Sequence, residues 1–68
     1  MTTFIERLET EKSELDDKIS KLNNFLNSDN FKTISEYQQL KLTEQVTYMM
    51  LYSRVLNERL QDLKKIIF

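Results

Sequence analysis

The chain has 68 residues with no Cys, His, Gly or Pro, and its charged residues, 31% of the total, leave a net charge of −1. These numbers predict a single domain, 1–68, and exclude disulfides, thiolate metal sites and histidine-based catalysis. The balanced charge argues against a nucleic-acid binder, which needs a basic excess. Because there is no membrane-length apolar run either, we expect a cytoplasmic protein without membrane contact.

Apolar residues in the first half recur at spacings of three, four and seven, which is typical of one stripe of an amphipathic helix. They are Phe4, Ile5, Leu8, Leu15, Ile19, Leu22, Phe25 and Leu26. Thr3 and Glu6 have the spacing of a capping box, so we expect a helix over about 3–27. The stripe is interrupted at Glu11 and Lys12, and this gap either tunes the helix register or faces a polar pocket.

The stretch "NSDNFKTIS", residues 27–35, is a cluster of turn-favouring residues between two helical patterns. Asn, Ser and Asp side chains compete with a helix for backbone hydrogen bonds, so the chain should reverse here. We expect Phe31 and Ile34 to fold back onto the end of the core. Thr33 with Glu36, or Ser35 with Gln38, supplies a second capping box for a helix over about 35–66. The sequence therefore predicts an all-α fold, an antiparallel helical hairpin.

The second helix carries more apolar surface than one neighbour covers. Tyr48, Leu51 and Val55 lie away from the predicted core stripe, and Met50 lies on a further side. A first helix of about 24 residues is also shorter than a second of about 30, so the end of the second, from Leu60 onward, should project beyond it. We expect these surfaces to assemble a homo-oligomeric helical bundle, most simply a dimer of hairpins. The predicted interface residues are Tyr48, Met50, Leu51, Val55, Leu60, Leu63, Ile66, Ile67 and Phe68.

The sequence contains none of the common catalytic, nucleotide-binding or metal-binding motifs, so we expect no enzyme activity, no metal and no cofactor. A binding role remains, in which tyrosine faces stack on a ligand while cationic side chains hold phosphate or carboxylate groups. The candidate ligand residues are Lys41, Gln45, Tyr48, Tyr52, Arg54 and Arg59. The alternative is structural: the tyrosines pack, the arginines pair with carboxylates, and Gln45, on the core stripe between Leu42 and Met49, fixes register.

The stretch "EKSELDDKISKLNNFLNS" (residues 11–28), together with single positions later in the sequence, resembles a family of very small phage and prophage helical-hairpin proteins. The resemblance covers nearly the whole chain, from about Phe4 to Leu60. These later positions are Phe31, Gln45, Met49, Tyr52, Ser53, Val55, Leu56 and Arg59. The tail "KKIIF" departs from the family pattern. The resemblance implies a phage origin and a role in infection or in the contest with host defence.

The leading hypothesis is a phage accessory protein that counters host defence by stoichiometric binding. In its sharper form the protein is an oligomeric sponge that sequesters a cyclic nucleotide immune signal, by analogy with other small helical-hairpin phage proteins. The alternatives are a helical inhibitor that docks on a host protein and a structural coiled-coil or assembly protein.

Overall fold

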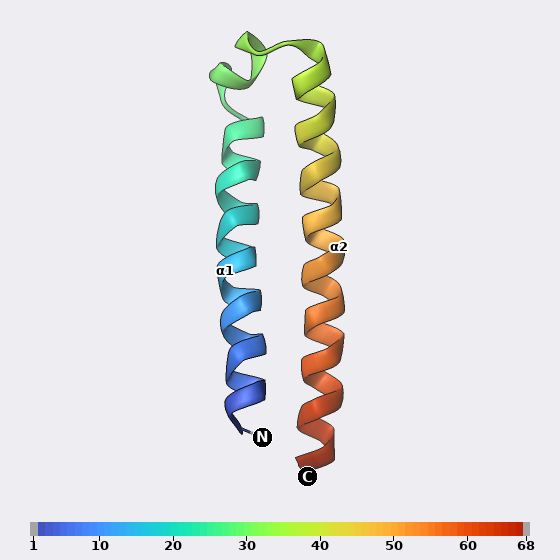
Figure 1. Cartoon of the computed structure of the whole chain (residues 1–68). Coiled ribbons are helices and arrows are strands. Elements are labelled where there is room, and N and C mark those ends of the chain that lie inside the picture. The colour runs from blue at the N-terminus through green and yellow to red at the C-terminus, as the bar shows by residue number, and fades with distance from the viewer. Residues whose placement is uncertain (1, 68) are drawn as a thin grey trace.

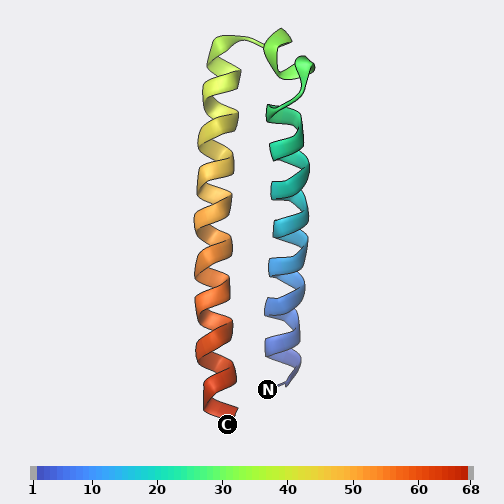
Figure 2. The same cartoon turned by 180° about the vertical axis from the view of Figure 1, so that it is seen from behind.

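The computed structural model describes the backbone of residues 2–67 and the side chains of residues 3–65. It contains helix α1 (Thr2–Leu26), the short 3-10 helix η1 (Asp29–Thr33) and helix α2 (Glu36–Ile67). The two long helices run antiparallel side by side, and η1 lies at the closed end of the hairpin (Figures 1 and 2). The molecule is a rod with extents of 50 × 14 × 14 Å. The predicted all-α hairpin is confirmed.

The chain reverses without glycine because the connection avoids left-handed backbone. No residue in the described range 2–67 has a positive φ. Extended residues, Ser28 and Ile34, instead flank the single turn of η1. The Ser28 hydroxyl donates to the Phe25 carbonyl at 2.6 Å, which satisfies an acceptor left free at the end of α1. Phe31 packs edge-to-face on Phe25 with ring centroids 6.1 Å apart, so the expected folding-back of Phe31 is confirmed.

Of the two caps predicted for the start of α2, the structure has Ser35 with Gln38, whereas Thr33 lies in η1 and its hydroxyl donates to the Asn30 carbonyl. Ser35 precedes the helix, and its hydroxyl accepts a hydrogen bond from the Gln38 backbone N–H at 3.2 Å. This is the N-cap arrangement that favours Ser at helix starts. The cap predicted for the first helix, Thr3, is wrong, because α1 already begins at Thr2 and Thr3 lies inside its first turn.

The core is a thin seam between α1 and α2. Leu8, Leu56 and Leu60 form a buried cluster against which Ile5, Leu15 and Leu63 pack, and Val46 is buried nearer the reversal. The prediction that Leu60 and Leu63 project beyond α1 is therefore wrong. Helix α2 extends past α1 at both ends: its first turns rise beside η1 and beyond the end of α1, and its last turn reaches past the start of α1 at the open end (Figure 1). The start of α1 and the end of α2 lie side by side at the open end of the rod (Figure 2).

The rest of the predicted interface divides into two groups. Tyr48, Met50, Leu51 and Val55 are exposed in the hairpin, as expected, with 44–66% of their surface accessible. Phe68 and the side chains of Ile66 and Ile67 lie outside the described residues. Among the described side chains, the exposed apolar surface that motivated the oligomer therefore lies along the middle of α2.

Candidate functional site

Four of the six predicted ligand residues line one shallow groove on α2, which we call the tyrosine groove. Its lining consists of Lys41, Glu44, Gln45, Tyr48, Met49 and Tyr52. The predicted members, Lys41, Gln45, Tyr48 and Tyr52, are separated by four, three and four residues. This spacing brings them to one side of an α-helix. The floor is mostly apolar, with a cation at the end nearer the reversal.

The ammonium group of Lys41 is held loosely. It lies 3.4 Å from a carboxylate oxygen of Glu44 and 5.5 Å from the ring centroid of Tyr37. Both ionic partners are more than 40% exposed, and such surface pairs stabilise proteins by about 0–1 kcal/mol. Lys41 can therefore exchange Glu44 for another anion, and the free energy lost with the ion pair is small.

The two predicted arginines occupy different sides of α2. Arg59 lies seven residues, or about two turns, after Tyr52 on the same side of the helix. It is near enough for its charge to oppose the upward shift of the Tyr52 pKa. Arg54 follows Tyr52 by two residues and so points about 200° away from it around the helix. The hairpin thus aligns Arg59 with the groove and separates Arg54 from it.

Gln45 and Tyr52 lie at the exposed margin of the contact between α1 and α2. Gln45 is exposed and its amide contacts the Met49 sulfur at 3.9 Å, so its expected burial within the core is wrong. Tyr52 is 44% exposed, whereas Ser53 turns toward α1. The physical reason is that α1 covers the side of α2 marked by Val46, Leu56 and Leu60, which leaves Gln45 and Tyr52 at the margin.

Hydrogen bonds from α2 to α1 anchor one wall of the tyrosine groove. The Tyr52 hydroxyl donates to the Glu11 carboxylate, and this bond raises the pKa of the phenol above its usual value of 10.0. One residue further, the Ser53 hydroxyl donates to Asp16, whose other oxygen lies 2.6 Å from the Lys12 ammonium. The polar gap noticed at residues 11 and 12 thus faces polar groups of α2. Asp16 and Ser53 were missed, and the gap itself was the signal that pointed to them.

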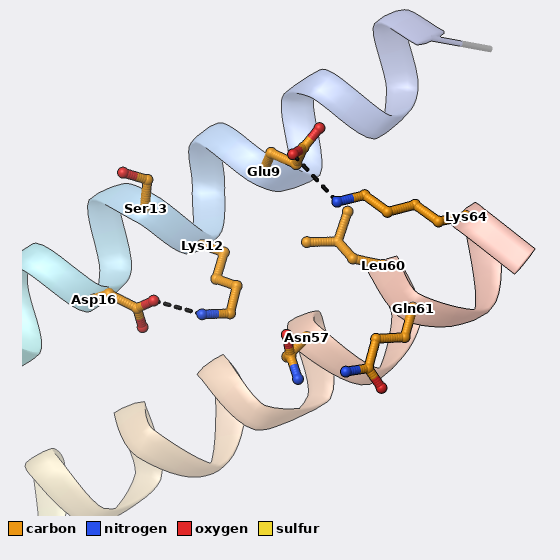
Figure 3. Close-up of a pocket in the computed structure, with 8 residues that line it drawn as sticks. All are labelled: Glu9, Lys12, Ser13, Asp16, Asn57, Leu60, Gln61 and Lys64. Carbon is orange, nitrogen blue, oxygen red and sulfur yellow. Dashed lines mark hydrogen bonds and ion pairs between the residues drawn. The ribbon is translucent and has the colours of Figure 1, made fainter.

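A second groove, the lysine groove, lies between α1 and the later part of α2 (Figure 3). It is lined by Glu9, Lys12, Ser13, Asp16, Asn57, Leu60, Gln61 and Lys64. Both of its lysines are paired, Lys12 with Asp16 at 2.6 Å and Lys64 with Glu9 at 3.5 Å, as the dashed lines show. Each lysine of this groove is paired with a carboxylate, and its lining contains no aromatic ring on which a base could stack, which makes it a poorer nucleotide site than the tyrosine groove.

The described part of the chain forms neither a metal-binding cluster nor a membrane-spanning helix. Among the residues described there is no group of three or more His, Cys, Asp or Glu placed to hold a metal ion. Within the same residues, no helix is long and apolar enough to cross a bilayer. What the geometry offers is an open groove with two phenol rings, an amide, a thioether and a nearby cation.

A comparison with known protein families shows to which family this chain belongs. A family model described as Sequestin matches residues 2–62, which is nearly the whole sequence. The chain belongs to the Sequestin family. The match includes the tyrosine groove, the polar contacts between helices and the buried cluster of this Sequestin hairpin. No curated protein and no solved structure matches the chain. This match is consistent with the resemblance to a small family, whereas the phage origin and the residue pattern stay predictions.

Proposed function

We propose that this Sequestin chain is a non-catalytic protein that acts by stoichiometric binding of a ligand. The family description, Sequestin, is compatible with a sequestering role, and this is the observation that carries the proposal. In its sharper form, the protein is a phage-encoded accessory protein that sequesters a cyclic nucleotide immune signal of the host and so counters host defence. The resemblance to small phage and prophage proteins supports this form.

The chemistry of the tyrosine groove supports a nucleotide-like ligand. Tyr48 and Tyr52 offer aromatic faces on which a base stacks, and 66% and 44% of their surfaces are accessible. Lys41 stands at one end of the groove and Arg59 continues the same side of α2 at the other. Cationic groups bind phosphate through charge-assisted hydrogen bonds, which are about twice as strong as neutral ones. A ligand that carries both a base and a phosphate matches these groups.

The openness of the groove supports an oligomeric form of the binder. Small-molecule sites usually bury about 70–90% of the ligand surface, and the side of one helix encloses far less. A second subunit placed over α2 supplies the missing wall. We therefore propose a homo-oligomer in which ligands are held between subunits.

Calorimetric titration of the purified protein tests the proposal. The panel contains cyclic dinucleotides, cyclic trinucleotides and cyclic ADP-ribose isomers, with the melting temperature followed in parallel. At least one compound should bind with a Kd of about 1 μM or tighter and raise the melting temperature. Lys41→Ala and Tyr48→Ala should each weaken that binding about tenfold or more. Lys65→Ala, a matched change on an exposed lysine outside the groove, should leave it unchanged.

The absence of heat and of any melting shift with every member of the panel would contradict the nucleotide form of the proposal. A helical inhibitor of a host protein is then the second candidate. The observation that favours it is the exposed apolar surface of α2, which includes Leu51 and Val55 at 44% exposure each. This candidate predicts a stable complex with a host protein that Leu51→Asp abolishes and Lys41→Ala preserves.

A further inference from the structure

An exposed row of side chains runs along α2 on a side that α1 does not cover. We call this row the outer stripe. It consists of Lys41, Glu44, Tyr48, Leu51, Tyr52, Val55, Arg59 and Asp62. Its four central members are large and apolar or aromatic, and they remain 44–66% exposed in the hairpin. At about 100° per residue, all eight positions fall within an arc of roughly 100° around the helix.

The spacing of the outer stripe is symmetric: it is the same whether the residues are followed from the N-terminal or from the C-terminal end of α2. From Lys41 to Leu51 the steps are three, four and three residues, and from Tyr52 to Asp62 they are again three, four and three. These steps keep side chains on one face of a helix, as in the seam of a coiled coil. The centre of symmetry lies between Leu51 and Tyr52, in the middle of the apolar segment.

The charges of the outer stripe change sign across this centre. Moving outward, the first charged residue is Glu44 on one side and Arg59 on the other, at equal separations from the centre. The next is Lys41 on one side and Asp62 on the other, again at equal separations. When two copies of such a helix lie antiparallel, every acid meets a base. When they lie parallel, like charges meet, which is unfavourable.

We propose that α2 pairs antiparallel with α2 of a second copy of this chain through the outer stripe. Leu51 then meets Tyr52 of the partner subunit at the two-fold axis, and Tyr48 meets Val55 of the partner subunit. Glu44 lies against Arg59 of the partner subunit, and Lys41 against Asp62 of the partner subunit. This interface is isologous, because each contact occurs twice by symmetry.

The remaining surfaces of the hairpin fit this arrangement. The side of α2 with Leu56 and Leu60 is buried against α1, so pairing through the outer stripe leaves the hairpin intact. On the described part of α1, the exposed large apolar residue is Phe4, near the open end of the rod. The ion pair within α2, Lys41 with Glu44 at 3.4 Å, is solvent-exposed and weak, so both side chains are free to take partners across the interface.

The pairing also completes the tyrosine groove. Lys41, Glu44, Tyr48 and Tyr52 belong to both the groove and the outer stripe, so the second copy lies along the open side of the groove. Arg59 of the partner subunit and Asp62 of the partner subunit then arrive next to Glu44 and Lys41, so the second copy brings one cation and one carboxylate to the groove. Each dimer has two such sites, related by symmetry. This consequence for the ligand rests on the proposed function, whereas the pairing itself does not.

Cysteine cross-linking without ligand tests the pairing, and the absence of native cysteine makes every introduced thiol unique. Leu51→Cys, next to the two-fold axis, should form disulfide-linked dimers under mild oxidation. Tyr48→Cys and Val55→Cys should each cross-link poorly alone but efficiently when the two variants are mixed. Efficient self-cross-linking of both, without preference for the mixture, would mean parallel helices and would overturn the proposal.

A charge exchange gives an independent test by analytical ultracentrifugation at micromolar concentration. The wild-type chain should sediment as twice its 8.2 kDa mass. Glu44→Arg and Arg59→Glu should each weaken dimerisation at least tenfold, because each places two like-charge contacts in the interface. The double variant restores opposite charges and should recover dimerisation to within about threefold of wild type. Glu14→Arg, on the exposed side of α1, is the matched control and should have no effect.

The outcomes separate the pairing from the proposed function. A well-folded wild-type monomer, or a double variant as weak as the single ones, would refute the pairing whatever ligand binds. A dimer with the expected cross-links that binds no nucleotide would leave the pairing standing and refute the ligand. Helical content measured by circular dichroism shows that each variant is folded.

Discussion

Individual polar side chains fix how the two helices face each other. Ser53 and Tyr52 of α2 donate hydrogen bonds to Asp16 and Glu11 of α1, and these contacts lie outside the apolar cluster. Polar contacts of this kind accept only one alignment of the helices, whereas leucines pack in several. The polar gap in the α1 stripe therefore acts on helix register. It also holds Tyr52 in place at the wall of the tyrosine groove.

The Asp16 contacts predict a stability difference that depends on pH. The Lys12 ammonium and then the Ser53 hydroxyl stabilise the carboxylate and hold the pKa of Asp16 below its usual 3.8. Because the folded-state pKa is the lower one, the stabilisation is present above pH 3.8 and is lost as the pH falls through the folded-state pKa. Asp16→Asn should therefore reduce the free energy of unfolding by about 0.5–1 kcal/mol at pH 7. This deficit should shrink toward zero in strong acid.

Urea unfolding at several pH values measures this effect. Asp17→Asn is the matched control, because Asp17 pairs with Lys21 on the same helix, at 3.0 Å, and both side chains are more than 60% exposed. Its effect should be smaller than that of Asp16→Asn. An Asp16→Asn deficit that stays constant down to pH 2 would show that the carboxylate charge is not what stabilises the contact.

Among the elements, the reversal determines which parts of α1 and α2 meet. It contains no glycine and reverses through extended backbone at Ser28 and Ile34 around η1. The Phe25–Phe31 contact at 6.1 Å ties η1 to the end of α1. The first turns of α2 therefore lie beside η1, and Leu60 reaches the level of Leu8. The reversal thus sets the register that buries the far end of α2.

The N-cap of α2 gives a prediction at this scale. Ser35→Ala removes the acceptor for the Gln38 N–H, which is 3.2 Å away, and leaves one donor of the first turn without its partner. The free energy of unfolding should fall by about 1 kcal/mol, measured by denaturant unfolding. Ser20→Ala, on an exposed interior position of α1, should be neutral or slightly stabilising because alanine favours helices. Equal effects of the two variants would argue against the cap.

The whole molecule is a narrow rod, 50 Å long and 14 Å wide, with little core for its length. Two packed helices of this size bury a single seam, so few side chains carry most of the apolar stabilisation. Leu56 is fully buried, and Leu8, Val46 and Leu60 are 5–6% exposed. A second subunit over the outer stripe adds a second seam, which is how small helical chains enlarge their core.

Truncation of Leu56 tests whether a few buried side chains supply most of the apolar stabilisation. Leu56→Ala should lower the free energy of unfolding by about 2–5 kcal/mol, through lost apolar burial and the cavity left behind. Leu40→Ala makes the same chemical change at a residue that is 56% exposed and outside the outer stripe. It should change stability by at most about 0.5 kcal/mol. Thermal melts followed by circular dichroism measure both, and similar losses for the two would contradict the thin seam.

Local patterns in the sequence were sufficient for much of this description. Apolar spacing predicted both helices to within two residues at their ends, and turn-favouring residues located the reversal. The Ser35 cap and the exposure of Tyr48, Leu51 and Val55 followed from the same local rules. These features depend on neighbours within one or two helical turns, so the sequence alone determines them.

Features that depend on both helices at once were decided only by the tertiary structure. The sequence placed Leu60 beyond α1 and Gln45 in the core, whereas Leu60 is buried and Gln45 is exposed. Both depend on the path of the reversal and on the rotation of α2 against α1, which no local spacing encodes. The polar contacts of Asp16 and Tyr52 belong to the same class, because they join residues 37 and 41 positions apart. Sequence determined the elements, and packing determined which sides of them remain free to bind.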